Sequence, residues 1–212
     1  MKYYKFFLVS LGVIIIDQLV KMIIHFNLEL GVAGQIVVFG DWFKIHYVLN
    51  PGMAFGLELP RPYGKILLSI FRMLAVIGIA YYLKLLIDKQ VHRGLLICIA
   101  LILGGAIGNV VDSTFYGVLL DNAPEGSPTP WFHGQVVDMF YIDIWEGILP
   151  EWVPLLGGKY YSFWPIFNIA DASIFVGVFT ILIFQGRFFP KPKKEEDNTT
   201  PTPETNVAKS SE

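Results

Sequence analysis

The sequence contains few charged residues. Asp, Glu, Lys and Arg make up 16% of its 212 residues, whereas about 25% is typical of soluble domains. Apolar side chains make up 54% and the mean hydropathy is +0.53, so there is too little charge to cover a water-facing surface of this size. These values favour an integral membrane protein.

Two further scarcities exclude classes of protein. Cys98 is the single cysteine, which rules out an internal disulfide framework and any multi-cysteine metal site. The formal net charge is −2 and there is no large basic block, so electrostatics give no reason to expect nucleic acid as a partner.

Four apolar stretches approach the length of about 20 residues that a helix needs to cross a bilayer. They cover approximately residues 6–24, 66–87, 95–111 and 163–184. The first carries Asp17 and Lys21 inside its apolar run and has no small-residue cleavage site, so we interpret it as a retained span and not as a secretory signal. The prediction is a mainly α-helical membrane protein with four transmembrane helices.

Positive charge is concentrated on one side of these spans. Nine Lys and Arg residues lie near the chain ends or around the short second connection: Lys2, Lys5, Lys84, Lys89, Arg93, Arg187, Lys191, Lys193 and Lys194. The two long connections, about residues 26–65 and 112–162, contain four: Lys44, Arg61, Lys65 and Lys159. Because cytoplasmic loops carry the excess of Lys and Arg, both termini are predicted to face the cytoplasm and both long loops the outside.

The long loops contain β-strand patterns. Residues 37–39 and 42–49 are apolar and aromatic runs on either side of Gly40-Asp41, which predicts a hairpin in which glycine supplies a positive φ. Residues 136–145 are rich in β-branched and aromatic side chains and suit another strand. We therefore expect a small outer β-sheet within a membrane domain of residues 1–189. Residues 190–212 are polar, proline-containing and free of aromatic residues, which predicts a disordered cytoplasmic tail.

Ionisable residues within these spans need a reason, because each costs on the order of 2.5–3.5 kcal/mol at the centre of a bilayer. Asp17 and Lys21 are spaced i, i+4 and can pair on one helix face, either as a structural ion pair or as the support of a polar site. If the last helix begins near Pro165, the Asp171 carboxyl group lies about 9 Å along it, just below the outer membrane surface.

The third span carries a stripe of small and polar residues. Gly105, Gly108, Asn109 and Asp112 are spaced i, i+3, i+4 and i+7, on one helical face. Glycine lets a neighbouring helix approach closely, and Asn and Asp supply hydrogen bonds across the contact. Packing accounts for the two glycines better than it accounts for Asn109 and Asp112.

The predicted topology brings four carboxyl groups to the outer level of the bundle: Asp17, Asp112, Asp138 and Asp171. Two carboxyl groups about 3 Å apart share one proton, so that one acts as a base and the other as an acid. Such a pair can activate water against an amide carbonyl and then protonate the leaving nitrogen. The sequence contains neither a G-x-S-x-G nor an H-E-x-x-H motif, so serine and zinc peptidase chemistry are poorly supported.

Five sequence blocks, in this order, resemble bacterial lipoprotein signal peptidase, also called signal peptidase II. They are Asp17-Gln18 with Lys21, residues 50–56 (NPGMAFG), 104–112 (GGAIGNVVD), 136–140 (VVDMF) and 167–173 (FNIADAS). The resemblance covers about residues 6–185. It implies a four-span aspartyl endopeptidase of the bacterial inner membrane that removes signal peptides from diacylglyceryl-modified prolipoproteins, cutting before the lipidated cysteine.

The resemblance also implies roles for individual residues. Asp138 and Asp171 would be the catalytic pair. Ten residues would bind substrate or support the site: Asp17, Lys21, Asn50, Gly52, Gly105, Gly108, Asn109, Asp112, Asn168 and Ala170. No metal or organic cofactor is implied, and the expected partners of the monomeric enzyme are prolipoprotein substrates and membrane lipids. Asp143 falls in no block and is predicted to be dispensable.

The sequence departs from the family pattern in two places. The glycine-rich block usually ends Asp-Arg, whereas Asp112 is followed here by Ser113; Arg72, in the outer half of the second span, is a candidate substitute. The outer loop is also enlarged, with 25 residues between Asp112 and Asp138 and 32 between Asp138 and Asp171.

Two other classes of protein stay open at this point. A proton-coupled transporter would also place carboxyl groups in a helical bundle, but it would need a polar path to the cytoplasmic side, where we see only Lys21 and Arg72. A non-catalytic membrane scaffold would keep the glycine stripe but would have no use for Asp138 and Asp171 together.

Overall fold

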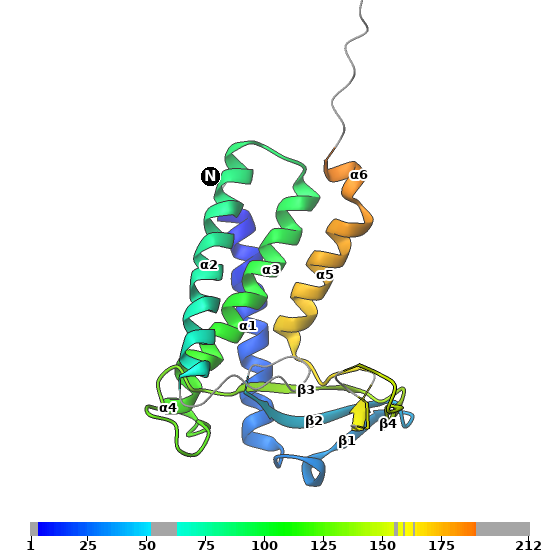
Figure 1. The fold of residues 1–212 in the computed structure, drawn as a ribbon. Coiled ribbons are helices and arrows are strands. Elements are labelled where there is room, and N and C mark those ends of the chain that lie inside the picture. The colour runs from blue at the N-terminus through cyan, green and yellow to red at the C-terminus, as the bar shows by residue number, and fades with distance from the viewer. Residues whose placement is uncertain (1–3, 52–62, 155–156, 159, 163, 190–212) are drawn as a thin grey trace, which may run out of the picture.

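The computed structural model describes residues 4–51, 63–154, 157–158, 160–162 and 164–189. Gly52, Phe163 at the expected start of the last span, and the predicted tail of residues 190–212 lie outside this part of the chain. Figure 1 shows a bundle of helices with a small sheet at one end.

Three helices in the described residues are long and apolar enough to cross a membrane. They are α1 (Tyr4–Asn27), α2 (Gly64–Asp88) and α3 (Arg93–Val111) with its helical continuation to Leu119. A fourth helix, α5 (Ile169–Ile183), is apolar but has 15 residues, and the short α6 (Gln185–Phe188) follows it. The prediction of a mainly helical protein with apolar, membrane-crossing helices is confirmed, and the fourth span stays a prediction.

The helix that carries Asp171 begins later than expected. Asn168 is its N-cap, and the Asn168 Oδ1 accepts a hydrogen bond from the Asp171 backbone N–H at 2.9 Å. The preceding residue, Phe167, forms an isolated antiparallel bridge with Phe140. Because that bridge holds the chain extended up to residue 167, a start near Pro165 was wrong, and Asp171 lies in the first turn of α5.

Helix α3 is central in the bundle and packs against α1, α2 and α5. Two adjacent glycines serve two of these contacts. A Cβ on Gly104 would come within 2.8 Å of the Ser10 carbonyl oxygen in α1, and one on Gly105 would overlap the Ala170 carbonyl oxygen in α5. Glycine at these positions therefore lets α1 and α5 approach the same level of α3.

The prediction of a small β-sheet built from the long loops is confirmed. Strands β1 (Ile36–Phe39), β2 (Phe43–Asn50) and β3 (Val136–Ile142) form an antiparallel sheet in that order. Gly40 takes a positive φ of 52° in the turn between β1 and β2. The register pairs Val48 with Asp138 and Asn50 with Val136, so the end of β2 lies beside the start of β3.

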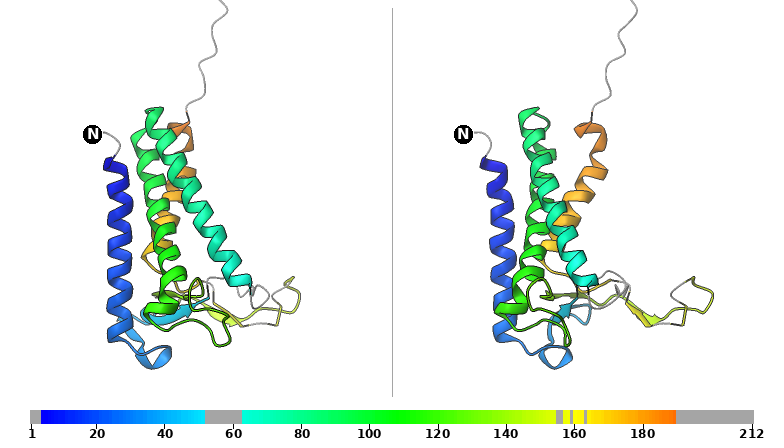
Figure 2. Two further views of the ribbon diagram at one scale, coloured as in Figure 1. Left: turned by 90° about the vertical axis from the view of Figure 1, so that its left-hand side faces the viewer. Right: turned by 60° about the vertical axis from the view of Figure 1, so that its left-hand side comes forward.

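The enlarged loop contributes a second, two-stranded sheet that was not predicted. It consists of β4 (Glu146–Ile148) and β5 (Tyr160–Ser162), which are antiparallel. Figure 2 shows this segment projecting to the side of the bundle.

A turn of π-helix, η2 (Asp112–Tyr116), joins α3 to the short α4 (Gly117–Leu119). The loop that follows folds back onto it: the backbone N–H groups of Phe132 and Gly134 donate to the carbonyls of Thr114 and Ser113 at 3.2 and 3.1 Å. π-Helical turns are often found at functional sites, and this one carries Asp112.

The two ends of the described chain lie together. The start of α1 and the end of α6 are at the end of the bundle opposite the sheet (Figures 1 and 2). The polar residues considered next come from the other end, where α3, α5 and β3 meet.

Candidate active site

Asp138 lies in β3 with 2% of its surface exposed. Both carboxyl oxygens accept hydrogen bonds from amide side chains. Asn168 Nδ2 donates to Oδ1 at 2.6 Å, and Asn50 Nδ2 donates to Oδ2 at 2.9 Å. The register of β2 against β3 brings Asn50 into reach, and the Phe140–Phe167 bridge brings Asn168.

Asp171 reaches the same region from the first turn of α5. Its Oδ1 accepts a hydrogen bond from Asn109 Nδ2 at 2.8 Å. A negative charge at this position is favoured by the N-terminal end of the helix dipole.

Asn168 and Asn109 connect the two aspartates. Asn168 Nδ2 also approaches Asn109 Oδ1 at 3.3 Å, so each asparagine bonds both to one aspartate and to the other asparagine. Three elements that are distant in sequence, α3, β3 and the start of α5, thus place the two carboxyl groups in one network.

Burial and, to a smaller extent, the negative charge of Asp171 raise the pKa of Asp138 to about 7, although the hydrogen bonds from Asn50 and Asn168 lower it. A carboxyl group that can hold and release a proton near neutral pH thus lies in one hydrogen-bonded network with a second carboxyl group. This is the arrangement that acid–base chemistry on a water molecule requires.

Lys21 forms a buried ion cluster beside this network. Its Nζ lies 2.8 Å from Asp17 Oδ2 and 2.6 Å from Asp112 Oδ2, and all three side chains are fully buried. It also donates to Asn109 Oδ1 at 3.2 Å. Asp17 and Lys21 thus form a buried ion pair, and Lys21 also contacts Asn109, the asparagine that donates to Asp171. Their role as support of a functional site stays a prediction.

The remaining site residues that we predicted pack around this cluster. The backbone N–H of Ala170 donates to Asp17 Oδ1 at 2.9 Å. A Cβ on Gly108 would lie 2.6 Å from Asp17 Oδ2, so only glycine leaves room for that carboxylate. Gly105 touches the Ala170 carbonyl, and Gly52 lies outside the described residues.

Two polar residues of the cluster were missed as site residues. Gln18 Nε2 donates to Asp112 Oδ1 at 2.9 Å, and the Tyr116 hydroxyl donates to Gln18 Oε1 at 2.9 Å. Gln18 is part of the Asp17-Gln18 block, so its place beside Asp17 was a usable signal. Tyr116 is the last residue of the π-helical turn, and no pattern in the sequence points to it.

Arg72 also reaches this site. Its Nη1 donates to Ser113 Oγ at 3.0 Å, and Ser113 Oγ in turn donates to the Asn109 carbonyl at 2.9 Å. The residue suggested as a substitute for the family's arginine is therefore in contact with Ser113, the position where that arginine usually stands.

Among the described residues, no group of three or more His, Cys, Asp and Glu side chains is arranged to hold a metal ion. The chemistry available at this site comes from carboxyl and amide groups.

Comparison with known proteins agrees with this geometry. A family model described as signal peptidase (SPase) II matches residues 9–187. The chain belongs to the signal peptidase II family. Members of this family are aspartic peptidases, and neither the transporter nor the scaffold alternative gains support.

Individual relatives match over most of their length. A lipoprotein signal peptidase of Amoebophilus asiaticus (strain 5a2) is 44% identical over 202 residues, which cover 95% of this chain and 86% of the relative. A lipoprotein signal peptidase of Porphyromonas gingivalis is 41% identical over 181 residues, which cover 80% of this chain and 77% of the relative. Two solved structures, both described as a bacterial membrane enzyme, are 26% identical with TM-scores of 0.58 and 0.59. They cover 87% and 92% of this chain, and the alignments span 95% and 96% of those chains.

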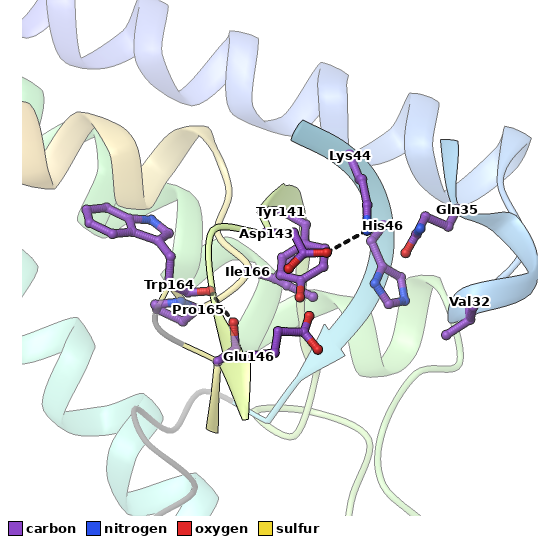
Figure 3. Close-up of a pocket in the computed structure, with 11 residues that line it drawn as sticks. Val32, Gln35, Lys44, His46, Tyr141, Asp143, Glu146, Trp164, Pro165 and Ile166 are labelled. Atoms are coloured by element: carbon purple, nitrogen blue, oxygen red, sulfur yellow. Dashed lines mark hydrogen bonds and ion pairs between the residues drawn. The ribbon is translucent and has the colours of Figure 1, made fainter. Parts of the chain in front are cut away.

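A separate pocket of this signal peptidase II family member changes the interpretation of Asp143. Figure 3 shows Lys44, His46, Asp143 and Glu146 around a cavity of about 420 Å³. Asp143 Oδ2 lies 2.6 Å from Lys44 Nζ, an ion pair that joins the start of β2 to the end of β3. Asp143 is thus a structural partner of Lys44, which makes it a poor neutral control for experiments on Asp138.

Proposed function

We propose that this protein is a membrane-bound aspartic endopeptidase that removes signal peptides from diacylglyceryl-modified prolipoproteins, cutting before the lipidated cysteine. Asp138 and Asp171 are the catalytic pair in this proposal. The relatives' names as lipoprotein signal peptidases support the substrate class.

One observation carries the assignment of the pair. Asp138 and Asp171 come from a strand and a helix that are far apart in sequence, and Asn168 and Asn109 link them into one hydrogen-bonded network. The carboxylates of Asp17 and Asp112 are both paired with Lys21, and so suit support, not chemistry on a substrate.

The proposed reaction consumes one water molecule. The ionised member of the pair removes a proton from the water molecule while the water oxygen forms a bond to the scissile carbonyl carbon. The protonated member gives its proton to the carbonyl oxygen. When the C–N bond breaks, a proton from the pair is transferred to the leaving nitrogen, and the other member of the pair takes back a proton from one hydroxyl group of the tetrahedral intermediate, which becomes the carboxylic acid product. The pair ends the cycle with one proton, as it began.

We further propose that α5 and α6 together provide the fourth span. Residues 169–188 are 20 residues long, and a helix of that length covers about 30 Å, the thickness of the hydrocarbon core. With both ends of the chain cytoplasmic, the sheet and the aspartate pair would face the outer side of the inner membrane. The excess of Lys and Arg at the end opposite the sheet supports this orientation.

The remaining parts of the proposal concern organisation. The membrane domain comprises residues 1–189, the tail begins at residue 190, and the enzyme acts as a monomer in contact with membrane lipids.

Cleavage of a defined precursor tests the function. Purified protein in detergent micelles is given a diacylglyceryl-modified prolipoprotein and the same precursor without the lipid, and the products are separated by gel shift and mass spectrometry. We expect cleavage of the lipidated form alone, at the bond before the modified cysteine. Equal cleavage of both forms would contradict the substrate assignment, and cleavage of neither would contradict the proposed activity.

A further inference from the structure

The aspartate pair carries negative charge that Lys21 does not balance. Lys21 Nζ is already held between Asp17 and Asp112, whose two charges exceed its one. A carboxyl pair that shares one proton still carries one negative charge. Since charge is costly where water is scarce unless it is paired, a second cation is expected at this site.

Arg72 meets that expectation from a different helix, α2. It is partly buried, and the carboxyl groups that act on its charge are, in decreasing order, Asp171, Asp112 and Asp138. The pair of aspartates is thus within its electrostatic reach.

The position of Arg72 is fixed by a short chain of hydrogen bonds. Arg72 Nη1 donates to Ser113 Oγ at 3.0 Å, Ser113 Oγ donates to the Asn109 carbonyl at 2.9 Å, and Asn109 Nδ2 donates to Asp171 Oδ1 at 2.8 Å. The arginine is therefore linked to the residue that holds Asp171.

We propose that Arg72 is a positioning residue of the active site, whose positive charge, held in place by Ser113, keeps one member of the aspartate pair ionised at neutral pH. This inference rests on the proposed function, because it assigns Arg72 a role toward the same two carboxyl groups.

Other charged groups also face this region and contribute to the electrostatic potential at the aspartate pair and at Arg72. Asp138 is acted on by Asp171 and by Lys21 from α1, and Arg72 is acted on by Asp112 and by its neighbour in α2, Lys65. None of these groups is altered in the experiment below, so their contributions cancel between wild type and variant.

Arg72→Gln removes the charge and keeps a side chain able to donate to Ser113. An opposite charge nearby lowers the pKa of a carboxyl group by about 1–3 units, less where water screens it. Loss of the cation should therefore favour the protonated form of the pair and displace the pH–activity profile upward by about 1 unit. In a cleavage assay from pH 4 to pH 9, both limbs of the kcat/KM profile should move to higher pH, so that the ratio of variant to wild-type activity rises with pH.

Three companion variants separate charge from structure. Arg72→Lys keeps the charge and should leave the profile in place. Ser113→Ala removes the hydrogen bond that holds Arg72 but not its charge, and should move the midpoints in the same direction as Arg72→Gln, but by less. Arg72→Gln/Ser113→Arg brings a guanidinium back to the same contact and should return the profile toward that of wild type, whereas Ser113→Arg alone crowds two cations together and should reduce activity.

The outcomes distinguish this inference from the proposed function. If wild type cleaves and the Arg72→Gln profile does not move, Arg72 has no electrostatic role, and the aspartate pair remains as assigned. Equal defects of Ser113→Arg with and without Arg72→Gln would likewise overturn the role of Arg72. If Arg72→Gln does not insert, Ser113→Asp, which neutralises Arg72 through the same contact, must displace the profile upward; an unmoved profile in that variant would refute the inference.

Discussion

Replacing Asp138 with asparagine is expected to abolish cleavage. At the same time, the variant should become increasingly more stable than wild type as the pH rises. Burial raises the pKa of Asp138 to about 7, whereas the same group in an unfolded chain titrates near 3.9. Between about pH 4 and pH 7 the folded carboxyl group stays protonated while the unfolded one has lost its proton. The stability of wild type therefore falls as the pH rises through this window.

The magnitude follows from the width of that window. Each pH unit within it costs wild type 1.36 kcal/mol, so two units, from pH 5 to pH 7, cost about 3 kcal/mol. An asparagine at position 138 does not titrate and avoids this cost. Asparagine also resembles a protonated aspartate in shape, so both forms meet the same donors from Asn50 and Asn168 at low pH. The stability of Asp138→Asn relative to wild type should thus increase by about 3 kcal/mol between pH 5 and pH 7.

Thermal unfolding followed by tryptophan fluorescence in detergent measures this difference. For a chain of this size, about 3 kcal/mol corresponds to a change in the Tm difference of about 6–12 °C. The matched control is Asp121→Asn, because Asp121 is exposed and its positive φ of 51° suits asparagine equally well. A Tm difference between Asp138→Asn and wild type that does not change between pH 5 and pH 7, or a similar trend in Asp121→Asn, would refute the reasoning.

Three further predictions concern the ion cluster, the topology and the tail. Lys21→Met leaves two buried carboxylates without a cation and should lower the free energy of unfolding by about 3–5 kcal/mol; the exposed Lys84→Met is the control in the same thermal assay, and an unchanged Tm for Lys21→Met would contradict the cluster's importance. Reporters fused after Gly34 or Asn122 should lie outside the cytoplasmic membrane. Reporters fused after Gln90 or Pro190 should lie in the cytoplasm. An inside signal at Asn122 would contradict the four-span topology. Truncation after Lys194 keeps the inner positive charges and should leave turnover of the lipidated precursor nearly unchanged, whereas a large loss in well-inserted protein would assign the tail a role.

Much of the fold could be predicted because it depends on local patterns. The three long helices begin and end within about three residues of the predicted spans, since an apolar run and its flanking polar residues determine both limits. The hairpin around Gly40 was equally predictable, because the turn needs a positive φ there. Topology alone placed the four carboxyl groups at one level of the bundle, and their position on the outer side of the membrane stays a prediction.

The features that could not be predicted depend on contacts between distant residues. The start of α5 is displaced from Pro165 to Ile169 because Phe167 pairs with Phe140, a bridge that no local signal announces. The separation of the four carboxyl groups into a buried ion cluster and an asparagine-linked pair depends on side-chain geometry across three helices and a strand. The ion pair of Asp143 with Lys44 likewise joins two strands that the sequence does not register against each other.

The most direct test of the account is the cleavage of a lipidated precursor by Asp138→Asn, Asp171→Asn and the double variant, each compared with Asp121→Asn. Each single substitution removes proton transfer while keeping side-chain size, and should lower kcat by about 100-fold or more without preventing membrane insertion. The double variant should be little worse than either single one, because residues that act as one unit have non-additive effects. Substantial turnover by Asp171→Asn, or a loss in Asp121→Asn as large as that in Asp138→Asn, would contradict the assignment of the catalytic pair.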